Sequence, residues 1–330
     1  MFGYIVRRVV AAFLVVVLTS MIVFAVFFLG PTDPAAQICN ANGRCTAERQ
    51  ALLEKSLGLD QSVFTAYGTF VKGLFVDRTI VAGGTYECEA PCLGISYTSR
   101  QEVRKQLMDK YPATISLALG GAAIYVFLGV VAGSLAARWR GTFADRALVS
   151  SSLLVSSVPY YVLCLMAWIF LTLQWSVFPT TGYFPITDNP VKTISGLLLP
   201  WLVLGIAQST VYARFSRGAM VEALGEDYAR TAAAKGVSRN KVIFKHGLRA
   251  AIVPVVTIFG LDFAFLLSGT IFTERIFEID GVGNYGLQAI APVDFPVLTA
   301  VVLVTAILVV TANLIVDVIY SFLDPRVRLG

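Results

Sequence analysis

Cysteine is the residue in this sequence with the clearest chemistry of its own. Four of the five cysteines, Cys39, Cys45, Cys88 and Cys92, lie between residues 31 and 112, and the fifth is Cys164. Their spacings differ from the tight Cys-x-x-Cys of many zinc sites. An even number of cysteines within one segment is typical of disulfides in an oxidising compartment. We predict two disulfides. Of the three possible pairings we favour the local ones, and we expect Cys164 to be a small buried hydrophobic residue.

Other patterns of catalysis or cofactor binding are weak in this sequence. A single histidine, His246, cannot supply a metal cluster or a Ser-His-Asp site. No Gly-x-x-x-x-Gly-Lys-[Ser/Thr] loop is present to bind ATP. GVGNYG at 281–286 matches a dinucleotide motif. It follows an apolar span instead of a strand and lacks a suitably placed acidic residue, so we expect a tight turn there. We therefore expect no catalytic residue, no metal and no cofactor in this chain.

Asp262 is an ionisable residue deep inside an apolar run. Such residues are costly in a membrane and often mark a transport route. The alternative is a polar side chain that is bonded to a neighbouring helix. The sequence leaves both interpretations open, and Asp262 is a candidate for the translocation path.

The stretch EDYARTAAAKG, residues 226–236, lies in a basic segment between two apolar runs. Gly225 and Gly236 mark its ends, and its acidic start suits a helix N-terminus. The small side chains of the alanine run would let another molecule approach the helix backbone closely. Interaction of the basic loop with anionic lipid would explain the charge but not the glycines or the alanines. The pattern favours a short helix that contacts another protein.

The composition requires membrane-spanning elements to hold these residues. Hydrophobic residues make up 56% of the 330 and charged residues only 14%, which indicates an integral membrane protein. With about 20 apolar residues needed for each span, we predict an all-α polytopic protein with six transmembrane helices. The predicted spans are 9–29, 113–137, 147–172, 194–213, 250–272 and 295–320.

The distribution of Lys and Arg predicts the orientation of these spans. Both termini and the loops 138–146 and 214–249 carry 15 of the 26 basic residues, whereas the short loops on the other side carry only Lys192 and Arg275. Basic residues collect in short cytoplasmic loops. We therefore expect both termini and the 214–249 loop in the cytoplasm, and residues 31–112 outside. The net charge of +5 follows from this topology and does not require a nucleic-acid partner.

The long outer loop has the sequence pattern of an ordered cap. We predict helices at 46–57 and 60–75, and a third at the membrane surface before Pro112 begins the second span. This cap could be a docking surface for an external partner or a lid that packs on this protein alone.

Several motifs in the expected order resemble the dipeptide/oligopeptide permease subunits of binding-protein-dependent ABC importers. DYARTAAAKGVSRNKVIFKHGLRAAIVPVVT resembles the cytoplasmic EAA-type loop of that family. YIVRRVVAAFLVVVLTSMIVFAVFFLGPTDPA resembles its first span, and YPATISLAL resembles the start of its second. FTERIFEIDGVGNYGLQAI and NLIVDVIYSFLDPRVR resemble its last loop and span. The resemblance covers nearly the whole chain, with Arg230 at the glutamate position of the general EAA pattern and the cysteine-bearing stretches as insertions.

The resemblance implies a type I ABC importer permease fold and a role for the short helix. That helix would be the coupling helix, which sits in a cleft of a cytoplasmic P-loop ATPase. The residues implied in this contact are Tyr228, Ala229, Arg230, Thr231, Ala232, Lys235 and Gly236.

The same resemblance implies partners and a division of the chain. The partners are a homologous second permease, one or two ATPase chains that bind ATP and Mg, an extracytoplasmic substrate-binding protein, and membrane lipid. The parts would be 1–30 with the first span, an extracytoplasmic loop domain at 31–112, and a permease core at 113–330 with the coupling loop 214–249. The substrate would be a di- or oligopeptide, with nickel, glutathione and haem as open alternatives. A self-sufficient secondary transporter or channel is the alternative function. It would need more polar residues within the spans.

Overall fold

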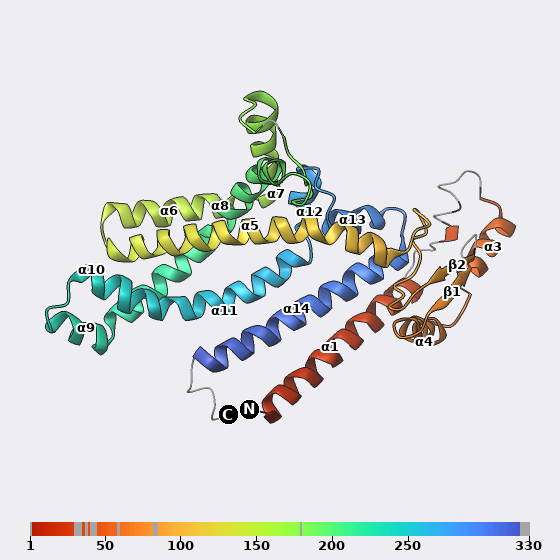
Figure 1. The fold of residues 1–330 in the computed structure, drawn as a ribbon, viewed down its shortest axis with the longest axis horizontal. Coiled ribbons are helices and arrows are strands. Elements are labelled where there is room, and N and C mark those ends of the chain that lie inside the picture. Colours follow the sequence, from red (N-terminus) through yellow and green to blue (C-terminus); the bar gives the residue numbers. More distant parts are fainter. Residues whose placement is uncertain are drawn as a thin grey trace. The chain divides into compact units, whose positions relative to one another are not determined.

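The chain forms two compact units that are dominated by long helices (Figure 1). The computed structural model describes residues 2–29, 35–36, 39, 45–57, 60–81, 85–178 and 180–323. Unit 1 comprises 1–114 and 281–311, and unit 2 comprises 115–280 and 312–330. Two long helices, α5 (Val103–Arg138) and α14 (Phe295–Leu323), contribute residues to both units.

Unit 1 combines the first helix with the segments that we predicted to lie outside the membrane. Its other elements are α1 (Phe2–Leu29), α3 (Ala47–Leu57), α4 (Val63–Gly73), β1 (Arg78–Val81), β2 (Thr85–Cys88) and α13 (Val282–Ile290). Apolar residues of α1, α4, α5, α13 and α14 form its core, with Phe24 of α1 packed against Phe70 of α4 and Phe295 of α14. Burial of these aromatic rings supplies much of the driving force for this packing.

Unit 2 contains the candidate coupling segment and the helices that flank it. Its elements are α6 (Phe143–Ser157), α7 (Tyr160–Ala167), the π-helix η1 (Trp168–Gln174), α8 (Pro190–Gly225), α9 (Asp227–Ala234), α10 (Arg239–Lys241), the π-helix η2 (Val242–Gly247), α11 (Leu248–Leu267) and α12 (Ile271–Ile276). The middle of the unit is a core of α5, α8 and α11 that includes Tyr125, Leu204, Tyr212 and Val255.

The described residues contain four helices that are long and apolar enough to cross a membrane. They are Val6–Leu29, Val103–Arg138, Pro190–Gly225 and Phe295–Val316. The pair formed by α6 and α7–η1 would make a fifth span, but it bends by 91°. Within α11, Pro254–Leu267 forms a shorter apolar helix. The chain is therefore a helical multi-pass membrane protein, and the count of six spans stays a prediction.

The predicted span over 147–172 is not a continuous helix, since the helix breaks between Ser157 and Tyr160, and a span there stays a prediction. Pro159 has no amide hydrogen and disfavours helical geometry at the preceding residue. Val158 is accordingly extended, with φ −82° and ψ 128°.

The outer segment departs from an all-helical cap in two ways. β1 and β2 form an antiparallel hairpin in which Arg78 pairs with Cys88 and Ile80 with Tyr86. β-Branched residues on both sides of a Gly-Gly pair in the sequence are typical of such a hairpin. The separate surface helix before Pro112 is also wrong, because α5 continues through that proline as one helix of 36 residues.

Two other local expectations in unit 1 need correction, while one is confirmed. The helix expected at 60–75 spans only Val63–Gly73, and the hydroxyl of Ser62 caps it by accepting from the Thr65 amide. The expected turn at 281–286 is instead the start of α13, which buries Val282 and Ala289 on one face. By contrast, α3 covers 47–57 as the sequence predicts.

Candidate coupling site

The short helix α9 begins directly after α8, with Glu226 as the only residue between them. Its C-terminal end has the hydrogen bonds of a Schellman motif. The amide of Gly236 donates to the Ala233 carbonyl, and the amide of Val237 donates to the Ala232 carbonyl. Gly236 has φ +80°, the left-handed conformation that this motif requires at that position. The sequence prediction of a glycine stop is thus confirmed.

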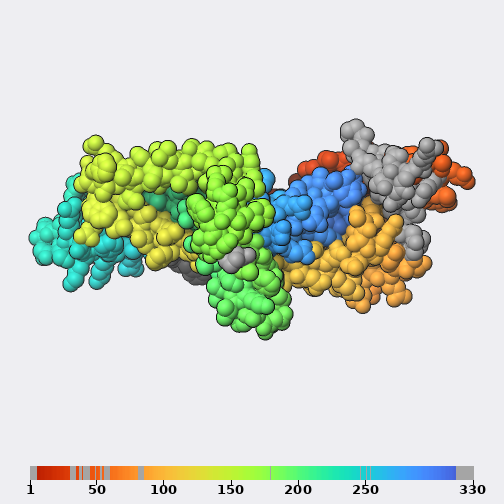
Figure 2. Space-filling model, turned by 90° about the horizontal axis from the view of Figure 1, so that it is seen from above, coloured from red at the N-terminus to blue at the C-terminus, as the bar shows by residue number. Residues whose placement is uncertain are grey.

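Most of the predicted contact residues lie on the exposed surface of α9. Tyr228, Arg230, Thr231, Lys235 and Gly236 are exposed, and Ala232 is half-buried. Ala229 differs, because only 2% of its surface is exposed and its methyl group faces the body of unit 2. In Figure 2 the teal residues around α9 and α10 stand at one end of this unit with open surface.

The charges on α9 make few strong contacts within the chain. Arg230 lies 3.8 Å from Asp227, and both side chains are largely exposed. An exposed pair of this kind adds little to stability. The face is therefore not held by strong interactions with the rest of its own unit.

The supports beneath α9 come from α8 and η2. Both elements contact α9, and they meet α11 in a small apolar cluster that contains Met220, Ile243 and Ala251. η2 is a π-helical turn, a feature that is frequent at functional sites. The inner side of α9 thus packs against α8 and η2, while its outer side is exposed to solvent.

Asp262 on α11 is bonded to a neighbouring helix. The hydroxyl of Tyr212 on α8 donates to its Oδ2 atom at 2.9 Å, and the ring of Tyr125 on α5 lies 4.7 Å from that of Tyr212. This geometry matches the structural interpretation that the sequence left open. A role of Asp262 in the translocation path stays a prediction.

Two polar contacts join α6 to α8 in the same unit. The carboxylate of Asp145 accepts two hydrogen bonds from Arg217, at 2.6 and 2.7 Å, and a third from the amide of Gly141 at 2.9 Å. About one turn before Arg217 in α8, Arg214 donates to the Ser156 hydroxyl at 3.1 Å. Ser156 also shares a 2.8 Å hydrogen bond with Thr210 of α8. Sequence reasoning missed these contacts, because nothing in a single sequence pairs a residue near 145 with one near 217.

The cysteines form the two local pairs in unit 1. Cys39 is bonded to Cys45, and Cys88 to Cys92. Cys164, in unit 2, is a free buried cysteine.

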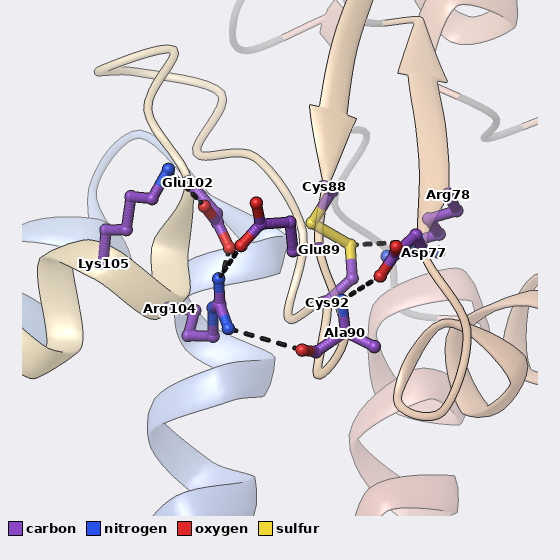
Figure 3. A network of polar contacts seen from close by, with 9 residues as sticks. All are labelled: Asp77, Arg78, Cys88, Glu89, Ala90, Cys92, Glu102, Arg104 and Lys105. Atoms are coloured by element: carbon purple, nitrogen blue, oxygen red, sulfur yellow. Dashed lines mark hydrogen bonds and ion pairs between the residues drawn. A yellow bond between two sulfur atoms is a disulfide. The ribbon is translucent and has the colours of Figure 1, made fainter.

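Figure 3 shows the polar network around the Cys88–Cys92 disulfide. Arg78 donates to Cys92 Sγ at 3.0 Å, and the Cys92 amide donates to the Gly73 carbonyl at 2.9 Å. Arg104 of α5 donates to Glu102, Glu89 and the Ala90 carbonyl. The disulfide hairpin is thereby bonded to the end of α4 through Gly73 and to the start of α5 through Arg104, of which Figure 3 shows the second link.

A buried carboxylate anchors the last helix of the same unit. Asp294, next to α14, accepts from the Ser96 hydroxyl at 2.6 Å and from the amides of Tyr97 and Thr98 at 3.0 and 3.1 Å. Only 2% of Asp294 is exposed. Burial, together with the nearby Asp294 charge, raises the pKa of the Tyr97 hydroxyl, which therefore stays neutral.

Unit 1 is thus held by directional contacts, and the short helix α9 of unit 2 presents an open face. These features define a multi-pass helical membrane protein with an ordered segment between its first two long helices and an exposed short helix between two later ones.

Comparison with known proteins identifies the family of this chain. Residues 129–329 match the family described as binding-protein-dependent transport system inner membrane component. Residues 1–118 match the N-terminal region of the membrane components of the same systems. The chain belongs to this family and is a permease subunit of an ABC importer.

Similar proteins align over nearly their whole length. A peptide transport system permease protein of Brucella abortus is 34% identical over 328 residues, which cover 99% of each chain. A peptide ABC transporter permease protein of Sinorhizobium fredii is 33% identical over 98% of this chain and 99% of its own. The glutathione transport system permease protein GsiC of Escherichia coli is 32% identical over 99% of both.

Proposed function

We propose that this subunit imports di- or oligopeptides by alternating access and performs no chemistry itself. It would form the pore with a homologous second permease. ATP and Mg would be bound by cytoplasmic ATPase subunits, and an extracytoplasmic binding protein would deliver the substrate. The peptide substrate is supported by the relatives named as peptide permeases. Another relative is named as a glutathione permease, and because glutathione is a small peptide, this name also agrees with a peptide substrate.

The observation that carries the coupling role is the exposed face of α9. This helix is fixed at both ends, by Glu226 after α8 and by the Gly236 stop, yet its outer residues have few strong contacts of their own. Tyr228, Arg230, Thr231, Ala232 and Lys235, with Gly236 as the stop, would contact the ATPase. Ala229 would act only by packing, because its side chain is buried.

The topology that we propose has six spans with both termini and α9 in the cytoplasm. The bend at Pro159 would divide the third span, and α11 would be the fifth. The distribution of basic residues supports this orientation. Alternating access would follow when closure of the ATPase pair displaces α9 and the helices shift as packed bodies.

A pull-down of the assembled transporter tests the coupling role. Arg230→Ala and Gly236→Val should reduce recovery of the ATPase with the permease, and should reduce ATP hydrolysis stimulated by the loaded binding protein. Arg146→Ala is the control, because this arginine is exposed and lies outside α9. Undiminished ATPase recovery and stimulated hydrolysis in both α9 variants would contradict the assignment.

The substrate is tested on the binding protein, where specificity is expected to reside. The purified binding protein should take up di- and oligopeptides in a calorimetric titration. Binding of nickel or haem with no binding of peptides would contradict the peptide proposal while leaving the coupling role intact.

A further inference from the structure

The helix α8 connects the coupling helix directly to the membrane-spanning part of unit 2. It runs for 36 residues from Pro190 to Gly225, and α9 follows after one residue. A displacement of α9 therefore acts directly on the end of α8. Whether the helices packed against α8 move with it depends on the contacts that join them to α8 near this end.

Two glycines allow α5 to approach the backbone of α8 closely. A Cβ atom added at Gly133 would lie 2.5 Å from the Ala213 carbonyl oxygen and 2.9 Å from the Arg217 amide nitrogen. One turn earlier, a Cβ at Gly129 would collide with Tyr212 and lie 3.0 Å from the Ser209 carbonyl oxygen. Small residues spaced by four are typical of tightly packed helix pairs in membranes. This contact makes α5 and α8 a closely packed pair.

The helix α6 is fixed to α8 by a different kind of contact. The forked guanidinium of Arg217 meets both carboxylate oxygens of Asp145, and only 5% of that carboxylate side chain is exposed. A bidentate pair sets the angle between the helices as well as their distance. Separating Asp145 from Arg217 would leave a buried carboxylate with the Gly141 amide but without its counter-charge, which is strongly unfavourable. An intermediate in which α8 moves and α6 stays behind is therefore disfavoured.

We propose that the Asp145–Arg217 pair is the positioning contact that makes α6 move with α5 and α8 when the ATPases displace α9. Arg217 lies eight positions before the end of α8, so the pair acts close to the point where the displacement enters. This role rests on the proposed coupling function of α9. In it, Arg217 contacts neither substrate nor ATPase; it transmits movement through Asp145 to the rest of α6.

The experiment measures transport for each ATP hydrolysed by the assembled transporter in proteoliposomes. Asp145→Asn and Arg217→Gln should lower this ratio by about tenfold, the size of a typical coupling between sites. The amount of ATPase bound to the permease should be unchanged. The exchange of both residues, Asp145→Arg with Arg217→Asp, should restore part of the ratio. Arg146→Ala, which alters an exposed neighbour of Asp145, should leave it at the wild-type value.

A purely structural role gives a different result. It would reduce the number of assembled transporters but leave the ratio for each one unchanged, and that outcome would overturn the proposal. If the Asp145→Asn protein does not accumulate in the membrane, the Arg217→Lys variant tests the proposal by itself, because it keeps both charges and loses only the second hydrogen bond of the bidentate pair. A wild-type ratio of transport to ATP hydrolysis in Arg217→Lys would also overturn the proposal. Failure of the ATPase to bind the wild-type permease would instead contradict the coupling function of α9.

Discussion

The outer segment of unit 1, which is the part of that unit that we predicted to lie outside the membrane, and the helix α9 of unit 2 satisfy their polar groups in opposite ways. In the outer segment, Asp294 accepts three hydrogen bonds from residues 196 to 198 positions away in the chain. Arg104 donates to Glu102, Glu89 and the Ala90 carbonyl, and a disulfide closes the Cys88–Cys92 loop. On α9, among the residues that the structure describes, the charged side chains of Asp227 and Arg230 form a long, exposed pair. In the outer segment the polar groups are bonded within the chain, whereas on α9 the polar side chains are exposed.

This difference indicates where a second protein is expected to contribute. A surface whose polar groups are already satisfied loses little without a partner, whereas the exposed face of α9 carries Tyr228 and Arg230, residue types that are enriched at protein interfaces. The part of unit 2 beneath α9 is held by packing of α8, η2 and α11. The following changes test whether each region is held as the contacts indicate.

Removal of the Asp294 carboxylate should have the largest effect. Asp294→Leu leaves the Ser96 hydroxyl and the Tyr97 and Thr98 amides without their acceptor, and should cost about 4 kcal/mol of unfolding free energy. The measurement is unfolding in mixed detergent and SDS micelles. Asp109→Leu is the control, because this carboxylate is exposed. Equal losses in the two variants would show that the buried carboxylate does not anchor the last helix.

Close packing in unit 2 should give the next largest effect. Gly133→Val places side-chain atoms against the backbone of α8, which cannot turn aside as a side chain can, and should cost about 3 kcal/mol. The matched control is Gly218→Ala on α8, where an added Cβ meets nothing within 4 Å. That change should stabilise the helix by less than about 1 kcal/mol. A tolerated valine at position 133 would contradict the close approach of α5 and α8.

Local signals in the sequence predicted the pieces of both regions better than the contacts between them. The bounds of α3 and the ends of α9 follow from caps and glycines within a few residues, and so these predictions agree with the structure. The Asp294–Ser96 bond joins residues 198 positions apart, and the Arg217–Asp145 pair joins residues 72 apart. Such distances are set by tertiary packing, which no local pattern encodes. The prediction that Pro112 separates two helices is wrong for the same reason, since tertiary packing around α5 overrides a local helix breaker.

Loss of the Cys88–Cys92 disulfide should have a moderate effect on the outer segment. The double change Cys88→Ser with Cys92→Ser should cost about 2 kcal/mol, because the unfolded chain is no longer restrained. Limited proteolysis should then cut near the hairpin more readily, while wild-type protein in reductant should behave like the variant. Alkylation gives the complementary measurement: the four cysteines of unit 1 should react only after reduction. Four freely reactive thiols before reduction would contradict both disulfides.

The smallest effect is expected at the end of the coupling helix. Gly236→Ala forces a Cβ into the left-handed conformation at φ +80° and should cost about 1 kcal/mol. The cost should appear as faster hydrogen exchange at the amides of position 236 and of Val237, which close the helix. Gly225→Ala is the matched control at the other flank, since an added Cβ there meets nothing and its backbone is not left-handed. If both alanines raise exchange equally, the left-handed stop is not what ends α9. If only the change at Gly236 does so, the open face of α9 depends on one backbone conformation, in contrast to the many side-chain contacts that hold the outer segment.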